Sequence, residues 1–409
     1  MSLNLKERTM VTKEIYGRYQ RARKKDKITI LDEFCNLTKY NRSYASYILR
    51  NYGRKFYLRK DGELIAVLIG GPTKSKKYKP KLYNGTTINV LKKIWYICDC
   101  ICGKRLAPAM KDVIPILEKY EEIVLNNKTR QLLFAISPAT IDRALKEERK
   151  KYILKVHKSR TKPGTLLKHQ IPIRTFSEWN DKRPGFVEMD LVGHDNGNIQ
   201  GEYAQTLDLT DIATTWTETQ AVRNKAQVWV FEALEHIRKQ LPFDILGIDS
   251  DNGSEFINDH LFSFCTNNKI TFTRSRAYRK NDNCFVEQKN YSIVRRYTGY
   301  LRYDTEKELN LLNELYKYLR LYTNFFLPTM KLIVKTHIGS KIIKKYDKPK
   351  TPYQRVLDSP SIPEDNKNKL VKQYKNLNPA ELKRQIDALQ RELINYQKVK
   401  RNKNICVLH

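Results

Sequence analysis

Residues 186–192 read FVEMDLV, and apolar and acidic side chains alternate along this stretch. A period of two is typical of a β-strand, in which successive side chains point to opposite faces of the sheet. The apolar residues are therefore expected on one face, and the acids Glu188 and Asp190 on the other. Asp190 lies in the middle of this predicted strand.

The chain after this strand alternates between strand-like and helical segments. The predicted elements are strands over 202–209 and 214–220, a helix over 225–241, a strand over 243–248, a helix over 259–268, a strand over 270–273 and a helix that begins near 283. Strands and helices in this order predict a mixed sheet flanked by helices. The fold class of the central region is therefore expected to be α/β.

Two further acids are expected close to Asp190. The strand over 243–248 leads into the sequence DSDNG, which is typical of a side chain presented at the carboxyl end of a strand, and this side chain is Asp251. Glu287 lies on the last predicted helix. Clustered carboxylates repel one another unless divalent cations bind them through oxygen. Asp190, Asp251 and Glu287 are therefore the candidate catalytic residues and ligands of two Mg²⁺ ions, for which Mn²⁺ would substitute.

Other acids in this region are weaker candidates. Asp249 competes with Asp251 for the role of second ligand, and we expect it to support the turn instead. Glu188 and Asp282 are expected to lie around the site or in solvent rather than on the metal.

These residues resemble the superfamily of retroviral integrases and insertion-sequence transposases, whose catalytic core has an RNase H-like fold and a D, D, E triad. The family string Asp-Asn-Gly-x-Glu-Phe is present at 251–256, and 35 residues separate Asp251 from Glu287. Residues further along the chain that also match are Tyr322, Asn324, Phe325, Pro328, Thr351, Pro352 and Arg355. The resemblance covers roughly residues 186–357. It implies two-metal-ion cleavage of DNA and transfer of the cut strand.

The chain departs from the family pattern in two respects. Many relatives have Lys or Arg seven positions after the glutamate, where this chain has Val294 followed by Arg295. Lys289 and Arg295 are therefore weaker candidates for DNA contacts than the triad is for catalysis. The His/Cys zinc module of retroviral integrases also has no equivalent here, which favours an insertion-sequence transposase.

The charge of the chain agrees with a nucleic-acid partner. Lys and Arg number 77 against 44 Asp and Glu, which gives a net charge of +33. Residues 186–300 differ, because their 16 acidic and 12 basic side chains give a net charge of −4. An acidic centre within a DNA-binding protein is costly unless cations neutralise it. With 40% hydrophobic residues, wholesale disorder is excluded.

Two helical regions are predicted before the catalytic core. Residues 1–70 are expected to form a helix-turn-helix domain whose recognition helix carries Arg42 and Arg50 as DNA contacts. Residues 71–150 are expected to form a second domain of the same kind. The alternative interpretation is a basic helical bundle that binds DNA without sequence preference.

The remaining boundaries follow from composition and periodicity. We expect a basic linker over 151–183, the RNase H-like core over 184–327, a small basic β-rich segment over 328–360 with a hairpin around Gly339, and a C-terminal helix over 361–409. Leu382, Ile386, Leu389, Leu393 and Tyr396 form a short heptad seam on that helix. The seam favours either pairing of two subunits or packing against its own chain.

Cysteine usage and hydropathy indicate a DNA-associated cytoplasmic protein. The seven cysteines show no disulfide framework and fit a reducing compartment. Cys98, Cys100 and Cys102 have no histidine nearby, so we expect buried thiols instead of a metal site. No apolar run reaches the roughly 18 residues of a membrane span, and the N-terminus lacks the apolar core of a signal peptide.

The leading interpretation is a transposase that binds the terminal repeats of its element and joins them to target DNA. Double-stranded DNA is the expected partner, and a homodimer or larger oligomer is expected in the synaptic complex. A catalytically silent regulator is expected to have lost a member of the triad, yet all three acids are present. A structure-selective nuclease fits less well with tandem helix-turn-helix units. A tyrosine recombinase is disfavoured because no His-x-x-Arg motif with a downstream tyrosine is found.

Overall fold

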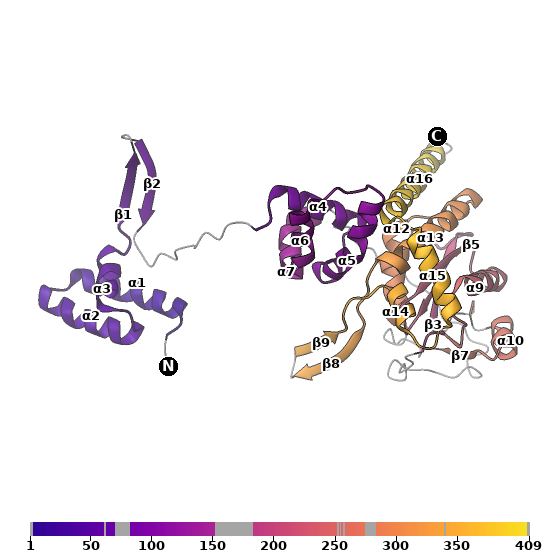
Figure 1. The fold of residues 1–409 in the computed structure, drawn as a ribbon, viewed down its shortest axis with the longest axis horizontal. Coiled ribbons are helices and arrows are strands. Elements are labelled where there is room, and N and C mark those ends of the chain that lie inside the picture. Colours follow the sequence, from indigo (N-terminus) through magenta and orange to yellow (C-terminus); the bar gives the residue numbers. More distant parts are fainter. Residues whose placement is uncertain are drawn as a thin grey trace. The chain divides into compact units, whose positions relative to one another are not determined.

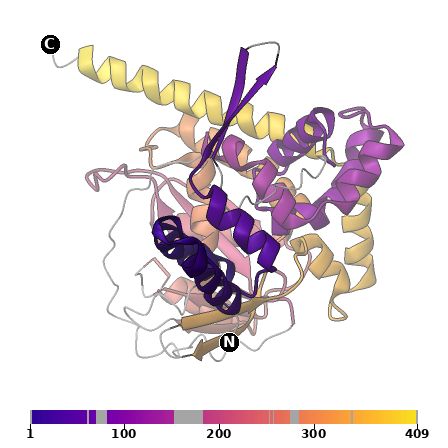
Figure 2. The same cartoon turned by 90° about the vertical axis from the view of Figure 1, so that its left-hand side faces the viewer.

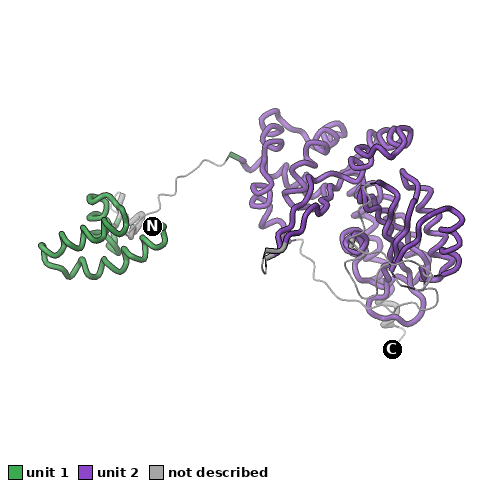
Figure 3. Tube along the Cα trace, turned by 90° about the horizontal axis from the view of Figure 1, so that it is seen from below, with its two compact units in different colours: residues 1–82 green, residues 83–409 purple. Residues whose placement is uncertain are grey.

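The computed structural model describes residues 3–60, 63–69, 82–151, 183–251, 253, 255–256, 258–274, 284–338 and 341–406. The chain divides into two compact units, Met1–Leu82 and Tyr83–His409 (Figure 3). The predicted basic linker falls almost entirely outside the described residues, and so does Asp282.

The first unit is a bundle of three helices followed by a hairpin. Its elements are α1 (Leu5–Arg21), α2 (Lys24–Thr38), α3 (Arg42–Asn51), β1 (Lys55–Lys60) and β2 (Glu63–Ile69) (Figure 1). The side chain of Asn4 accepts hydrogen bonds from the first turn of α1, and that of Asn41 does so for α3. Phe34 and Leu49 are fully buried in the small core between the helices. The three helices agree with the prediction from the sequence, whereas the hairpin was not predicted.

The second unit is built on a five-stranded sheet. Its strands are β3 (Phe186–Gly193), β4 (Gln205–Asp211), β5 (Thr217–Val222), β6 (Gly247–Ser250) and β7 (Thr271–Arg274), in the order β5-β4-β3-β6-β7. The β4 strand is antiparallel to β3 and β5, whereas β6 is parallel to β3 and β7. This mixed sheet flanked by helices confirms the predicted RNase H-like fold class.

The two faces of β3 meet different surroundings, as the alternation predicts. Val187 and Met189 are buried in a cluster formed with α9 (Gln227–Gln240) and α10 (Asp259–Asn267). Glu188 and Asp190 point to the other face. There α11 (Cys284–Lys289) contacts both β3 and β4.

Helices from distant parts of the chain share a second core. They are α4 (Gly85–Ile97), α5 (Gly103–Lys119), α6 (Asn127–Ala135), α7 (Pro138–Ala144), α13 (Glu306–Phe326), α14 (Pro352–Asp358), α15 (Glu364–Lys375) and α16 (Pro379–Cys406). The short helix α8 (Lys146–Lys150) follows α7 and has no buried residue. Leu106, Leu133 and Leu315 are fully buried in this one cluster. Tyr322 on α13 also donates a hydrogen bond to the carbonyl of Ile97, 2.5 Å away. Residues 85–150 thus pack within the same unit as the sheet, whereas the sequence analysis expected a separate domain.

The C-terminal elements show what the heptad seam packs against. Leu382, Ile386, Leu389 and Leu393 of α16 are buried in the shared core. The helix α16, the long helix at the C-terminal end of the chain in Figures 1 and 2, packs against α13 of the same chain. The predicted basic hairpin is present as β8 (Leu332–Ile338) and β9 (Lys341–Tyr346). No helix in the described part of the chain has both the length and the apolar composition that a membrane span requires.

Candidate active site

The sheet register places two of the predicted acids side by side. In the parallel pair of β3 and β6, Glu188 pairs with Asp249 and Met189 with Ser250. Asp190 and Asp251 are the next residues along the chain after this last pair, and adjacent strands lie about 4.8 Å apart. Burial raises the pKa of Asp190, and repulsion from Asp251 raises it further. The two carboxylates are therefore electrostatic neighbours.

Glu287 approaches the same point from the helix that crosses this face. It lies on α11 with an exposed side chain. Repulsion from Glu287 also contributes to the raised pKa of Asp190. The structure thus brings Asp251 and Glu287 each within electrostatic reach of Asp190. Among the described residues, however, no three acidic, histidine or cysteine side chains converge closely enough to hold a metal ion.

The turn after β6 separates the roles of two neighbouring acids. Asp249 is fully buried within the sheet, where it accepts a hydrogen bond from the hydroxyl of Thr273 on β7. Asp251 is half-buried beyond the strand end, and its Oδ1 accepts the backbone N–H of Gly253 at 2.8 Å. Asp249 therefore ties the strands together, whereas Asp251 lies at the edge where a ligand has access.

Asn290 orients Asp190, and the sequence analysis did not identify it. It is the first residue of η2 (Asn290–Arg295), a wider π-helical segment that continues α11. Its side-chain amide donates to Oδ2 of Asp190 at 2.6 Å, while Oδ1 of Asp190 accepts the N–H of Leu191 at 2.8 Å. The signal was its position three residues after Glu287, since such residues share one side of a helix.

Glu188 positions the helix that carries Glu287. Its Oε2 accepts the backbone N–H of Val286, 2.8 Å away, in the first turn of α11. The side chain is fully buried, and burial raises its pKa well above the ordinary value, with repulsion from Asp249 adding to this. Glu188 is therefore neither a solvated acid nor at the exposed edge of the site.

Two replacements of Glu188 distinguish its positioning role from a role that depends on its negative charge. Gln keeps an oxygen that accepts the N–H of Val286, so we expect the Glu188→Gln variant to retain near wild-type activity. Glu188→Ala leaves that N–H without its acceptor, and we expect activity to fall by about 10- to 100-fold. Rates of DNA strand cleavage for both variants, measured beside circular dichroism spectra, check this. Equal losses in the two variants would show that the charge of Glu188 matters instead.

An acid and a base are buried beneath the site. Asp208 on β4 pairs directly with Asp190 on β3, so both side chains lie on the same face. Burial raises the pKa of Asp208 well above its ordinary value, and attraction to Lys289 opposes that shift. Lys289 is only 9% exposed, and burial lowers its pKa to about 8. The alternation of polar residues in β4 was the signal for Asp208, which the sequence analysis missed.

Three of the four predicted DNA-binding residues interact within the protein. Lys289 is attracted to Asp208, as described above. Arg295 donates to the carbonyl of Gly193 at 2.6 Å and lies 4.8 Å from the ring centroid of Tyr300. Arg42 forms an ion pair with Asp32. DNA contact by any of these residues stays a prediction.

The second unit therefore combines an RNase H-like core with acidic side chains at the ends of adjacent strands. No family model matches the chain. The uncharacterized protein y4rM of Sinorhizobium fredii (strain NBRC 101917 / NGR234) is 37% identical over 355 residues, which cover 86% of this chain and 96% of that protein. The chain therefore belongs to the same family as y4rM.

Solved structures with a similar fold include retroviral integrase cores. The catalytic core domain of HTLV-2 integrase, in complex with magnesium in a dimeric form, is 14% identical with a TM-score of 0.28 and covers 36% of this chain and 90% of its own. The catalytic core domain of BIV integrase is 16% identical with a TM-score of 0.27 and covers 46% of this chain and 98% of its own. At such low scores, a functional assignment depends on the residues of this chain.

Proposed function

We propose that the protein is a DNA transposase of the insertion-sequence type. Asp190, Asp251 and Glu287 are the carboxylates that serve phosphodiester cleavage and strand transfer. The observation that supports this proposal is the register of β3 and β6, in which Met189 pairs with Ser250, so that Asp190 and Asp251 are the residues that follow on two neighbouring chain segments.

The donor set around Asp190 suits Mg²⁺ or Mn²⁺. The three acids offer only oxygen, and Oδ1 of Asn290 is a buried oxygen without a hydrogen-bond partner in the described structure. Mutual repulsion of the carboxylates opposes their convergence, and a bound cation would remove that repulsion. Two such ions would supply activation of a water or 3′-hydroxyl and stabilisation of the leaving oxygen. Asn290 and Glu188 hold Asp190 and α11 in place for this chemistry.

The proposed substrate is double-stranded DNA, both the element ends and the target. The net charge of +33 supports a polyanionic partner. The basic hairpin adds a candidate surface, because Lys335 and Lys344 lie directly opposite each other across β8 and β9. Like charges in that arrangement destabilise a hairpin unless an anion lies over them. Recognition of the ends by α1–α3, assembly as a homo-oligomer and a cytoplasmic, DNA-associated location belong to the same proposal.

A strand-transfer assay tests the proposed function. Labelled duplexes that carry the DNA flanking the coding sequence are incubated with the full chain and Mg²⁺, Mn²⁺ or a chelator. We expect cleaved and joined products with either metal, none with the chelator, and recovery when the metal is restored. Products that form in the chelator would contradict metal catalysis. Tight binding without any product would favour a regulator, and cleavage without joining a nuclease.

A further inference from the structure

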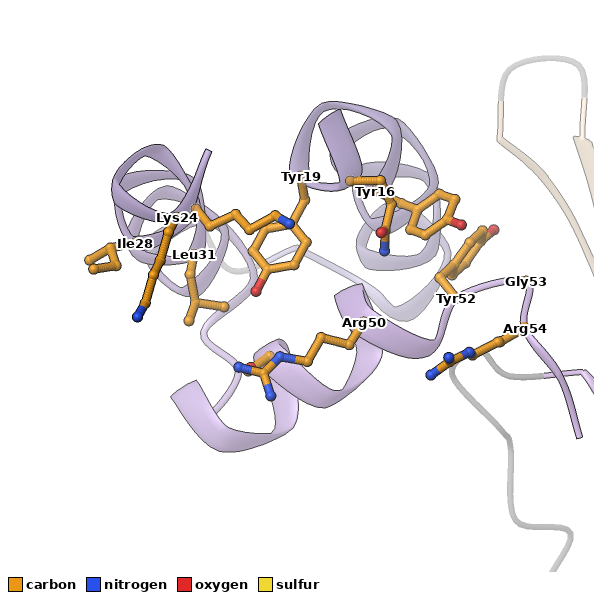
Figure 4. A pocket seen from close by; sticks show the side chains of 12 residues that line it. Tyr16, Tyr19, Lys24, Ile28, Leu31, Arg50, Tyr52, Gly53 and Arg54 are labelled. Atoms are coloured by element: carbon orange, nitrogen blue, oxygen red, sulfur yellow. The ribbon is translucent and has the colours of Figure 1, made fainter. Parts of the chain in front are cut away.

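A groove in the first unit is not used by the proposed catalytic function. It has a volume of about 690 Å³ and lies between the second half of α1, the start of α2, the outer side of α3 and residues 52–54 (Figure 4). All of its lining residues belong to the first unit. Its volume falls in the range typical of ligand-binding clefts.

The groove carries positive charge that the protein does not neutralise. Its charged lining residues are all basic: Lys24, Lys27, Arg50 and Arg54. None of the four forms an ion pair within the described structure, whereas Arg18 pairs with Glu33 and Arg42 pairs with Asp32 elsewhere on the same unit. Figure 4 shows Arg50 extending from α3 below Tyr19, with Lys24 near one end of the groove and Arg54 near the other. This row of uncompensated cations fits an extended polyanion.

Aromatic rings lie beside these cations. Tyr16 and Tyr52 are half-buried and their ring centroids are 5.1 Å apart. The ring of Tyr19 is covered by the ammonium group of Lys27, 5.5 Å from its centroid. Tyr16 and Tyr52 also line the groove, and no cation is recorded over either ring among the described residues. A basic groove that also offers aromatic rings is typical of surfaces that bind unpaired nucleic-acid strands.

We propose that this groove binds a single DNA strand. Its phosphates lie against Lys24, Arg50 and Arg54, and a base stacks on Tyr16 or Tyr52. A duplex keeps its base faces inside its own stack, so only an unpaired strand brings a base face to a tyrosine ring. This binding does not depend on the acids of the second unit, so it can hold or fail independently of the proposed catalysis.

Salt-dependent binding of the full chain tests the phosphate contacts. The probes are a fluorescent oligothymidylate, a duplex of equal length and dextran sulfate, a polyanion without bases. Arg50 and Arg54 are exposed, so their replacement leaves the core intact. For the Arg50→Ala/Arg54→Ala variant, we expect the slope of log affinity against log salt to become shallower by about 1.4 with the oligothymidylate. Arg18→Ala is the matched control, because Arg18 lies outside the groove and is already paired with Glu33, and it should leave the slope unchanged.

Replacement of the rings tests the base contact. We expect Tyr52→Leu to weaken oligothymidylate binding on the order of tenfold and to leave dextran sulfate binding unchanged. Photo-crosslinking of an iodouracil-containing strand should label peptides with Tyr16 or Tyr52. The proposal is overturned if the double variant keeps the wild-type slope with oligothymidylate, if Tyr52→Leu weakens duplex binding as much as single-strand binding, or if all crosslinks fall outside residues 16–54.

Discussion

The Asp190→Asn variant is expected to lose both strand cleavage and strand joining, by a factor of about 1,000 or more. Asn keeps the size of the side chain but removes the negative charge of Asp190, which is the acid that both Asp251 and Glu287 repel. Oδ1 of the new amide can still accept from Asn290, so the local fold should persist. Asp251→Asn and Glu287→Gln are expected to give the same result. Gel assays of cleavage and joining, beside binding measurements on the same DNA, check this.

Asp244→Asn provides the matched control for this loss. Asp244 is an exposed acid in the same unit, shortly before β6. Its replacement changes the net charge equally and should leave both reactions intact. If the control loses activity as Asp190→Asn does, overall charge matters rather than the triad. If Asp190→Asn still cuts DNA, the site assignment is wrong.

The Arg320→Ala variant is expected to lower the free energy of unfolding of the second unit by about 3–5 kcal/mol. Arg320 on α13 donates from Nε to both carboxylate oxygens of Glu218 on β5, at 2.7 and 2.8 Å, and from Nη2 to the carbonyl of Gln240. The side chain of Glu218 is only 2% exposed. Without Arg320, the buried carboxylate keeps Trp216 Nε1 as its hydrogen-bond donor but has lost its counter-ion.

Urea unfolding followed by tryptophan fluorescence measures this change. The chain has four tryptophans, at positions 95, 179, 216 and 229, and all belong to the second unit. Lys350→Ala removes an exposed ion pair with Asp358 and should cost less than about 1 kcal/mol. A Glu218→Leu/Arg320→Leu double variant should recover most of the loss, because no unpaired charge remains. A loss below about 1 kcal/mol for Arg320→Ala would show that the pair contributes little.

Acid should lessen the defect of Arg320→Ala. Burial raises the pKa of Glu218, and Arg320 opposes that shift, so removal of Arg320 raises the pKa further. A carboxyl whose pKa is higher in the folded state binds protons more readily when folded. The folded state therefore gains stability as the pH falls towards that pKa. The difference between variant and wild type should shrink at lower pH in the same urea experiment.

Local geometry made the core of the candidate site predictable. A strand has a period of two, so FVEMDLV alone placed Glu188 and Asp190 on one face and the apolar residues on the other. The position of Asp251 after a strand followed from its turn sequence in the same way. By contrast, the partner of Lys289 is Asp208, which comes from a strand about 80 residues earlier in the chain. No local sequence pattern indicates which strand lies beside β3.

Packing between distant segments could not be predicted from the sequence either. The periodicity of residues 85–150 shows that these helices have apolar faces, but not that α13 and α16 cover them. The same holds for the heptad seam of α16, for which the sequence left two partners open. The hairpin of β1 and β2 is a different case, because its signal was present. Asp61 and Gly62 stand between two strand-like runs, and this dipeptide is a strong indicator of a hairpin.

The π-helical segment after Glu287 changes which residue returns to the side of the helix that carries Glu287. In a regular helix, seven residues make about two turns, so a side chain seven positions after Glu287 returns to the same side. A π-helical turn contains about one residue more than an α-helical turn. The residue that returns to the side of Glu287 is then the eighth after it and not the seventh. Val294, the seventh, is instead fully buried, and Arg295 is the eighth. One inserted residue in a helical turn can thus change the spacing in the sequence while keeping the direction of the side chain in space.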